Sequence, residues 1–85
     1  MLTIKYFSTN WCQPCKAFAP VFDSVMSNDN IPFNKVDAEI SKDLAVQYSV
    51  SSVPTLIFEK DSTVVYRHTG VMSRSQLEAT INKFR

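Results

Sequence analysis

The chain contains two cysteines, and both lie where a predicted strand gives way to a predicted helix. Cys12 and Cys15 are separated by Gln13 and Pro14. A bridge between them closes a loop too small to restrict the unfolded chain strongly, so a purely stabilising role explains the pair poorly. Two cysteines also cannot form the framework of several bridges on which small secreted domains depend. The pair therefore favours a chemical role.

Hydrophobic spacing predicts four strands and three helices. Short β-rich runs bounded by turn residues indicate strands, and apolar residues at three- and four-residue spacing indicate helices with one buried face. In the helix after Cys12, for example, Phe18, Phe22 and Val25 fall on one face. The predicted strands are Thr3–Ser8, Phe33–Asp37, Thr55–Glu59 and Thr63–His68, and the predicted helices run from Cys12 to about Ser27, from Ser41 to about Tyr48, and from Ser73 onward.

The order of these elements, β-α-β-α-β-β-α, predicts an α/β fold. The first strand-helix-strand unit is compact, which favours parallel strands with a right-handed crossover. The last two strands are joined by Lys60, Asp61 and Ser62 and should form an antiparallel hairpin. We expect a mixed four-stranded sheet with helices on both faces. Because 85 residues show no linker and no repeat, we expect one domain over residues 1–85.

Two serines precede predicted helices and are expected to cap them. Ser41 can cap the short second helix with its hydroxyl group. Ser73 and Gln76 have the spacing of a capping box at the start of the last helix. Each serine therefore marks a predicted helix start.

Composition excludes several classes of function. The net charge is +1 and no cluster of Lys and Arg is present, so the chain lacks the basic patch that nucleic-acid binding requires. Gly70 is the only glycine, which excludes the glycine-rich loops of classical nucleotide sites. The sequence shows neither a signal peptide nor an apolar run long enough to span a membrane. We therefore expect a cytoplasmic protein that binds neither nucleic acid nor membrane.

A helix that begins beside Cys12 suits this cysteine to nucleophilic attack. Backbone amides and the helix dipole lower the pKa of such a thiol from about 8.5 toward neutrality. Cys15, on the apolar face of the helix, should be more buried. Cys12 would then attack a substrate disulfide, and Cys15 would resolve the mixed disulfide by attacking Cys12. An external reductant must then reset the pair.

A metal site is the main competing interpretation of the cysteine pair. Zinc needs two further Cys or His ligands, and the chain offers only His68, which is better explained as a histidine at a strand edge. We therefore predict no metal site within one chain. A zinc or iron-sulfur site shared between two chains would reveal itself as bound metal and a dimeric mass.

Six segments in order resemble the thioredoxin family, and the resemblance covers nearly the whole chain. These segments are Trp11-Cys12-Gln13-Pro14-Cys15-Lys16, Ala19-Pro20, Lys35-Val36-Asp37, Tyr48, Val53-Pro54-Thr55-Leu56 and Thr69-Gly70-Val71. The resemblance implies a thioredoxin-like fold in which Cys12 attacks, Cys15 resolves and Pro54 is a cis-proline that faces the dithiol. It also implies a substrate groove around the pair, formed by Trp11, Gln13 at the rim, Pro14, Val53, Pro54, Gly70 and Val71.

The chain departs from the family pattern at several positions. Gln13 replaces the usual glycine, and Tyr6 replaces the aspartate that thioredoxins bury beneath the dithiol. Lys35 matches the lysine that neighbours this aspartate and would therefore act alone, as a charge that favours a Cys15 thiolate. Our hypothesis is that the Tyr6 hydroxyl or a water molecule handles the proton of Cys15. Gly70 is explained equally well by a close backbone approach and by a turn.

The resemblance also implies partners. We expect a monomeric electron-transport protein that reduces protein disulfides, such as that of ribonucleotide reductase. No cofactor is expected beyond the redox-active Cys12–Cys15 disulfide, with electrons supplied by an NADPH-linked thioredoxin reductase. The family's first strand and helix are missing, which leaves a glutathione-dependent enzyme of the glutaredoxin type as one alternative. The other is a docking subunit that uses the groove without redox chemistry.

Overall fold

The computed structural model describes residues 1–85 and confirms the predicted order of elements. None of the three helices is both long enough and apolar enough to cross a membrane. Each predicted element is present, and the ends differ from prediction by a few residues at most. The elements are β1 (Leu2–Ser8), α1 (Gln13–Asp29), β2 (Phe33–Asp37), α2 (Lys42–Gln47), β3 (Thr55–Lys60), β4 (Thr63–Thr69) and α3 (Arg74–Phe84).

The four strands form one mixed sheet in the order β2-β1-β3-β4. β1 pairs in parallel with β2, with Tyr6 opposite Lys35. The β1–β3 and β3–β4 pairs are antiparallel, and Tyr6 also lies opposite Leu56 of β3. β1 is therefore an inner strand, and its carboxyl end delivers the chain to the cysteine pair.

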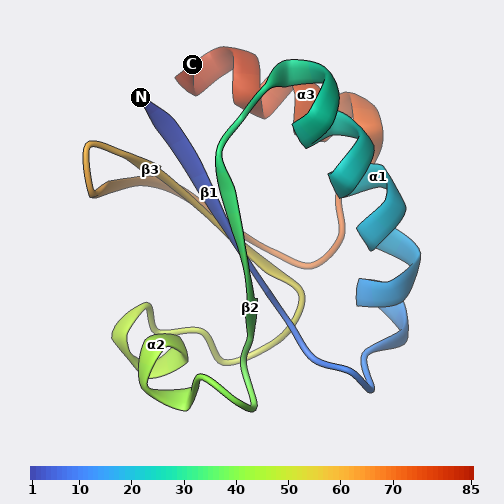
Figure 1. The fold of residues 1–85 in the computed structure, drawn as a ribbon, viewed down its shortest axis with the longest axis vertical. Helices are drawn as coiled ribbons and strands as arrows, with labels where there is room; N and C mark the ends of the chain where they lie inside the picture. Colours follow the sequence, from blue (N-terminus) through green and yellow to red (C-terminus); the bar gives the residue numbers. More distant parts are fainter.

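Helices cover both faces of the sheet, as predicted. α1 and α3 lie on one face and α2 lies on the other (Figure 1). Successive residues of β1 point to opposite faces, so Tyr6 belongs to the core under α1 and α3, while Phe7 belongs to the smaller core under α2. The larger core includes Phe18 and Phe22 of α1, and the smaller one includes Ala45 of α2.

α1 runs unbroken through Pro20 and extends beyond the predicted end at Ser27. It stops after Asp29 because Asn30 adopts the left-handed conformation, with a φ of 53°, and its N–H bonds to the carbonyl of Met26. Asparagine tolerates this conformation better than most residues do, so Asn30 sets the end of the helix.

The two predicted serine caps have different outcomes. Ser73 and Gln76 form the complete capping box at the start of α3. Ser41 precedes α2, but its side chain makes no capping hydrogen bond, so this prediction is wrong. Its backbone angles of −101° and 61° are not the extended ones that bring a hydroxyl over the helix start. The turn before α2 is held instead by Asp37, whose Oδ1 accepts from the amides of Glu39 and Ile40.

An ion pair is enclosed beside α2. Lys5 Nζ lies 2.5 Å from Oε1 of Glu59, a residue that is only 4% exposed. The hydroxyl of Tyr48 donates to the other oxygen of this carboxylate at 2.9 Å. The hydrogen bond that Lys5 donates to Glu59 is the main cause that raises the pKa of Lys5 above its ordinary value. Both oxygens of the buried carboxylate thus have partners, which is what makes its burial tolerable.

Candidate functional site

Cys12 and Cys15 form a disulfide at the start of α1. Cys12 is the N-cap residue, and the backbone N–H of Cys15 donates to its Sγ at 3.2 Å. The carbonyl of Cys12 accepts from the amide of Lys16 at 3.1 Å, which closes the first turn. Pro14 fits this turn because it has no N–H to leave unpaired there. The helix start therefore holds both sulfur atoms in fixed positions.

The two cysteines are buried to the same degree in this oxidised state. Cys12 is 4% exposed and Cys15 is 3% exposed, so the expectation that Cys15 is the more buried of the two is wrong here. The cause is the segment before β3, since the carbonyl oxygen of Val53 lies 3.9 Å from Cys12 Sγ. The neighbouring side chains of Trp11, Gln13 and Pro14 are exposed.

Pro54 follows Val53 through a cis peptide bond, as the resemblance implies. Pro54 is buried, whereas Val53 is half-buried. The hydroxyl of Thr55 donates to the carbonyl of Ser52 at 2.7 Å and fixes the turn that leads into the bond. Through Val53, this turn brings a backbone carbonyl against the disulfide.

The segment containing Gly70 is attached to the same turn. The amide of Gly70 donates to the carbonyl of Pro54 at 2.8 Å. A Cβ at position 70 would meet no atom within 4 Å, so a close backbone approach does not explain this glycine. The backbone angle φ of +102° explains why this residue is glycine, because residues with a side chain rarely adopt this conformation. Val71, next in sequence, is 51% exposed, and its carbonyl lies 3.3 Å from Nε2 of His68.

Tyr6 lies beneath the cysteine pair, at the position where the family resemblance placed an aspartate. The residue is 1% exposed, and its hydroxyl donates to the backbone carbonyl of Cys15 at 3.0 Å. Burial, and secondarily the charge of Asp23, raise the pKa of this phenol above its ordinary value of 10.0. Tyr6 is therefore neutral near pH 7, and its one proton is engaged with the backbone of α1.

Lys35 does not stand alone beneath the dithiol, contrary to expectation. Its Nζ lies 2.6 Å from Oδ1 of Asp23, which α1 presents toward β2. Both side chains are about half exposed, at 43% and 51%. The carboxylate that balances this lysine therefore comes from the exposed side of α1 instead of from β1.

A small pocket of about 170 Å³ lies beside these groups. Tyr6, Cys15 and Lys35 are among the residues that line it. This volume accommodates water with several polar partners. Water in this pocket is therefore the better candidate for the proton acceptor of Cys15, and the role of Tyr6 in proton handling stays a prediction.

Replacing Tyr6 by phenylalanine separates these two possibilities. We expect Tyr6→Phe to lower the free energy of unfolding by about 1 kcal/mol, because a buried hydrogen bond to Cys15 is lost. The pH dependence of disulfide reduction should keep its midpoint, because a phenol with a raised pKa holds its proton through the neutral range. Urea unfolding and rates measured between pH 5 and pH 9 check both expectations. A displaced midpoint would show that the hydroxyl takes part in proton transfer.

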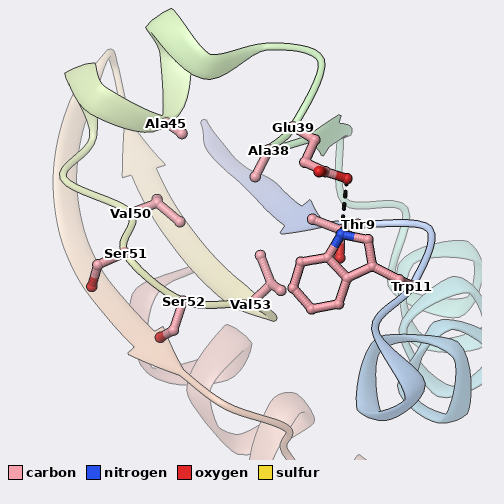
Figure 2. A pocket seen from close by; sticks show the side chains of 9 residues that line it. All are labelled: Thr9, Trp11, Ala38, Glu39, Ala45, Val50, Ser51, Ser52 and Val53. Carbon is pink, nitrogen blue, oxygen red and sulfur yellow. Dashed lines mark hydrogen bonds between the residues drawn. The ribbon is translucent and has the colours of Figure 1, made fainter.

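A larger groove of about 410 Å³ opens on the α2 side of Trp11. Of the seven predicted groove residues, Trp11 and Val53 line it. The other five do not, namely Gln13, Pro14, Pro54, Gly70 and Val71. The indole Nε1 of Trp11 donates to Oε2 of Glu39 at 2.8 Å. The dashed line in Figure 2 marks this hydrogen bond. Sequence reasoning missed seven lining residues, namely Thr9, Ala38, Glu39, Ala45, Val50, Ser51 and Ser52.

The parallel pairing of β1 and β2 contained a signal for some of these residues. The carboxyl ends of two paired parallel strands lie at the same edge of a sheet, so the residues after Asp37 must lie near those after Ser8. Ala38 and Glu39 could therefore have been placed near Trp11. No sequence pattern around Val50, Ser51 or Ser52 indicated that these residues line the groove.

Comparison with known proteins gives a consistent result. The Thioredoxin family model matches residues 2–83. Thioredoxin C-2 of Corynebacterium nephridii is 39% identical over 80 residues, which cover 91% of this chain and 73% of that protein. The mitochondrial thioredoxin of Bos taurus is 37% identical over 79 residues, which cover 91% of this chain and 48% of that protein, so the chain spans about half of its length. The X-ray structure of Fasciola hepatica thioredoxin superposes with a TM-score of 0.91 at 32% identity, covering 99% of this chain and 81% of that one.

Proposed function

Because this chain belongs to the thioredoxin family, we propose that it reduces protein disulfides through Cys12 and Cys15. Family membership together with the Cys12–Cys15 pair makes the chain a thiol-disulfide oxidoreductase. One observation carries the proposed substrate class: the disulfide sits at the start of α1, with the Val53 backbone carbonyl 3.9 Å from Cys12 Sγ. A substrate backbone can pair with the half-buried segment at Val53 as an added strand.

The first step is the attack of the Cys12 thiolate on one sulfur of the substrate disulfide. A bond forms between Cys12 Sγ and that sulfur, and the bond between the two substrate sulfurs breaks. The second substrate sulfur leaves as a thiolate and takes a proton from solvent. The N–H of Cys15, aimed at Cys12 Sγ from 3.2 Å, stabilises negative charge on the attacking sulfur.

The second step regenerates the bridge. Cys15 loses its proton to water and attacks Cys12 Sγ, and the remaining substrate sulfur leaves as a thiolate. That thiolate then takes a proton from solvent, so the substrate gains two electrons and two protons. The protein supplies both electrons and the Cys15 proton, and solvent supplies the other proton, because Cys12 enters the reaction as a thiolate. Lys35 favours the charged form of Cys15 through its ammonium group, to an extent that its pairing with Asp23 reduces.

The electron donor and the cellular setting are part of the same proposal. An NADPH-linked thioredoxin reductase would return two electrons to the Cys12–Cys15 disulfide, and no other cofactor is needed. Protein disulfides such as that of ribonucleotide reductase are the substrates. Residues 1–85 would act as one domain and as a monomer, in the cytoplasm, in an electron-transport chain of thiols. Trp11, Gln13, Pro14, Val53, Pro54, Gly70 and Val71 would contact the substrate.

Reduction of insulin disulfides tests the proposal with two electron sources. With thioredoxin reductase and NADPH, we expect NADPH oxidation that depends on both this protein and insulin. With glutathione and glutathione reductase in place of that system, we expect little turnover. Turnover with glutathione alone would support the glutaredoxin-type alternative, and no insulin reduction by the prereduced protein would contradict the proposed function altogether.

A further inference from the structure

The groove beside Trp11 has one charged residue among the residues that line it. That residue is Glu39, which is exposed and forms no ion pair. Its Oε2 accepts from the indole of Trp11 at 2.8 Å, and its Oε1 has no partner in the chain. A carboxylate has room for several donors on its two oxygens. The groove therefore presents a negative group that can accept from a ligand.

The Trp11 indole adds a second feature that favours a cation. The side chain is held in place by Glu39 and yet Trp11 is 64% exposed. An indole face attracts a positive charge through the ring quadrupole, more strongly than the other aromatic rings do. Asp37 adds negative charge at the same turn, since its Oδ1 accepts from the amide of Glu39. Indole and carboxylate together form one wall that suits an ammonium or guanidinium group.

The remaining walls of the groove are mostly apolar. Ala38, Ala45, Val50 and Val53 surround the space beside the indole (Figure 2). Thr9 also lines the groove, and its buried hydroxyl oxygen has no hydrogen-bond partner within the chain. An aliphatic stem can pack on the alanine and valine side chains while its charged end stays near the carboxylate. The groove thus matches a side chain that is apolar along its length and positive at its tip.

We propose that this groove binds a lysine or arginine side chain of the substrate, at a residue close to the cysteine that Cys12 attacks. The inference rests on the proposed function, because Val53 lines the groove and its carbonyl lies 3.9 Å from Cys12 Sγ. The stem of the basic residue packs on Ala38, Val50 and Val53, and its tip lies between the Glu39 carboxylate and the Trp11 ring. Acidic side chains are repelled at this position, and purely aliphatic ones leave the carboxylate without a partner.

Short disulfide-linked peptides that differ at one residue test the proposal. Each peptide carries lysine, norleucine or glutamate at one position near its cysteine, and the positions on both sides of the cysteine are tried in turn. Norleucine keeps the length of the lysine stem and removes its charge. At one position at least, we expect kcat/KM for the lysine peptide to exceed that for norleucine about fivefold, which is of the size that an exposed cation-π contact and ion pair together supply. The preference should shrink as salt is added.

Variants of Glu39 show whether this residue causes the preference for the lysine peptide. In Glu39→Gln the amide oxygen can still accept from Trp11, but the charge is gone, so the lysine and norleucine peptides should react equally. In Glu39→Lys the glutamate peptide should become the preferred one. Glu78→Gln, which removes a partly exposed carboxylate that pairs with Arg74 on α3, is the control and should keep the preference of the wild type.

Two results would overturn the inference: equal rates for all three peptides at every position, or a lysine preference that survives in Glu39→Gln. Insulin serves as the reference substrate in the same assay. If insulin is reduced while the peptides show no preference, the subsite is wrong and the proposed function stands. If insulin is not reduced by the prereduced protein, the proposed function itself fails and the subsite inference fails with it.

Discussion

Cys12→Ser is expected to abolish reduction of protein disulfides. Serine cannot supply a thiolate, so no mixed disulfide forms and the rate should fall by at least about 10³-fold, as it does when enzymes lose a catalytic nucleophile. The insulin assay with saturating reductase measures this loss. Cys12 caps α1 through its Sγ, and a serine hydroxyl can fill that role, so the variant should stay folded.

The Cys15→Ser variant should stop at a later step of the reaction than Cys12→Ser does. Cys12 can still attack, but nothing resolves the product, so one substrate molecule should remain bound through a mixed disulfide that mass spectrometry detects. The comparison also addresses the docking alternative. A partner-dependent activity that Cys12→Ser retains in full would mean that the groove acts by binding and that the cysteines are incidental.

Phe22→Ala is expected to cost the largest share of the protein's stability. Phe22 is fully buried, and its ring lies 4.7 Å from that of Tyr6 and 5.4 Å from that of Phe33, measured between centroids. Removing a buried phenylalanine ring typically costs about 3–5 kcal/mol, which is much of the 5–15 kcal/mol that holds a small domain folded. Urea unfolding of the oxidised protein measures the change.

Val46→Ala is the control for this prediction. Val46 lies on α2 and is 77% exposed, so its truncation should change the free energy of unfolding by no more than about 0.5 kcal/mol. A loss below about 1 kcal/mol in Phe22→Ala would mean that the core between α1 and the sheet does not carry the stability assigned to it.

The fold could be predicted from local patterns because the spacing of apolar residues within each element shows which of its faces is buried. Phe18, Phe22 and Val25 mark the buried face of α1 by their spacing alone, and Ser73 with Gln76 marks the start of α3. The chemical role of the cysteine pair could also be predicted, since both cysteines lie in the sequence at the helix start that activates them. Ser41 was misread, because a serine caps a helix only when its backbone is extended.

The surroundings of the dithiol were harder to predict because they arise from long-range contacts. Trp11 and Glu39 are 28 residues apart in sequence, and only the pairing of β1 with β2 brings them together. Lys35 of β2 forms an ion pair with Asp23 of α1, so its charge is balanced by a residue whose position in the helix looks merely solvent-exposed. Burial of Cys12 depends on Val53, which lies 41 residues away in the sequence.

A single-turnover experiment tests the central claim most directly. Fully reduced protein is mixed with one equivalent of a protein disulfide, quenched at intervals, alkylated and weighed by mass spectrometry. The account predicts that the thiols of Cys12 and Cys15 disappear together as an internal disulfide, while the substrate gains the same number of thiols. Persistence of both thiols in the protein, or a stable adduct on Cys12 of the wild type, would contradict it.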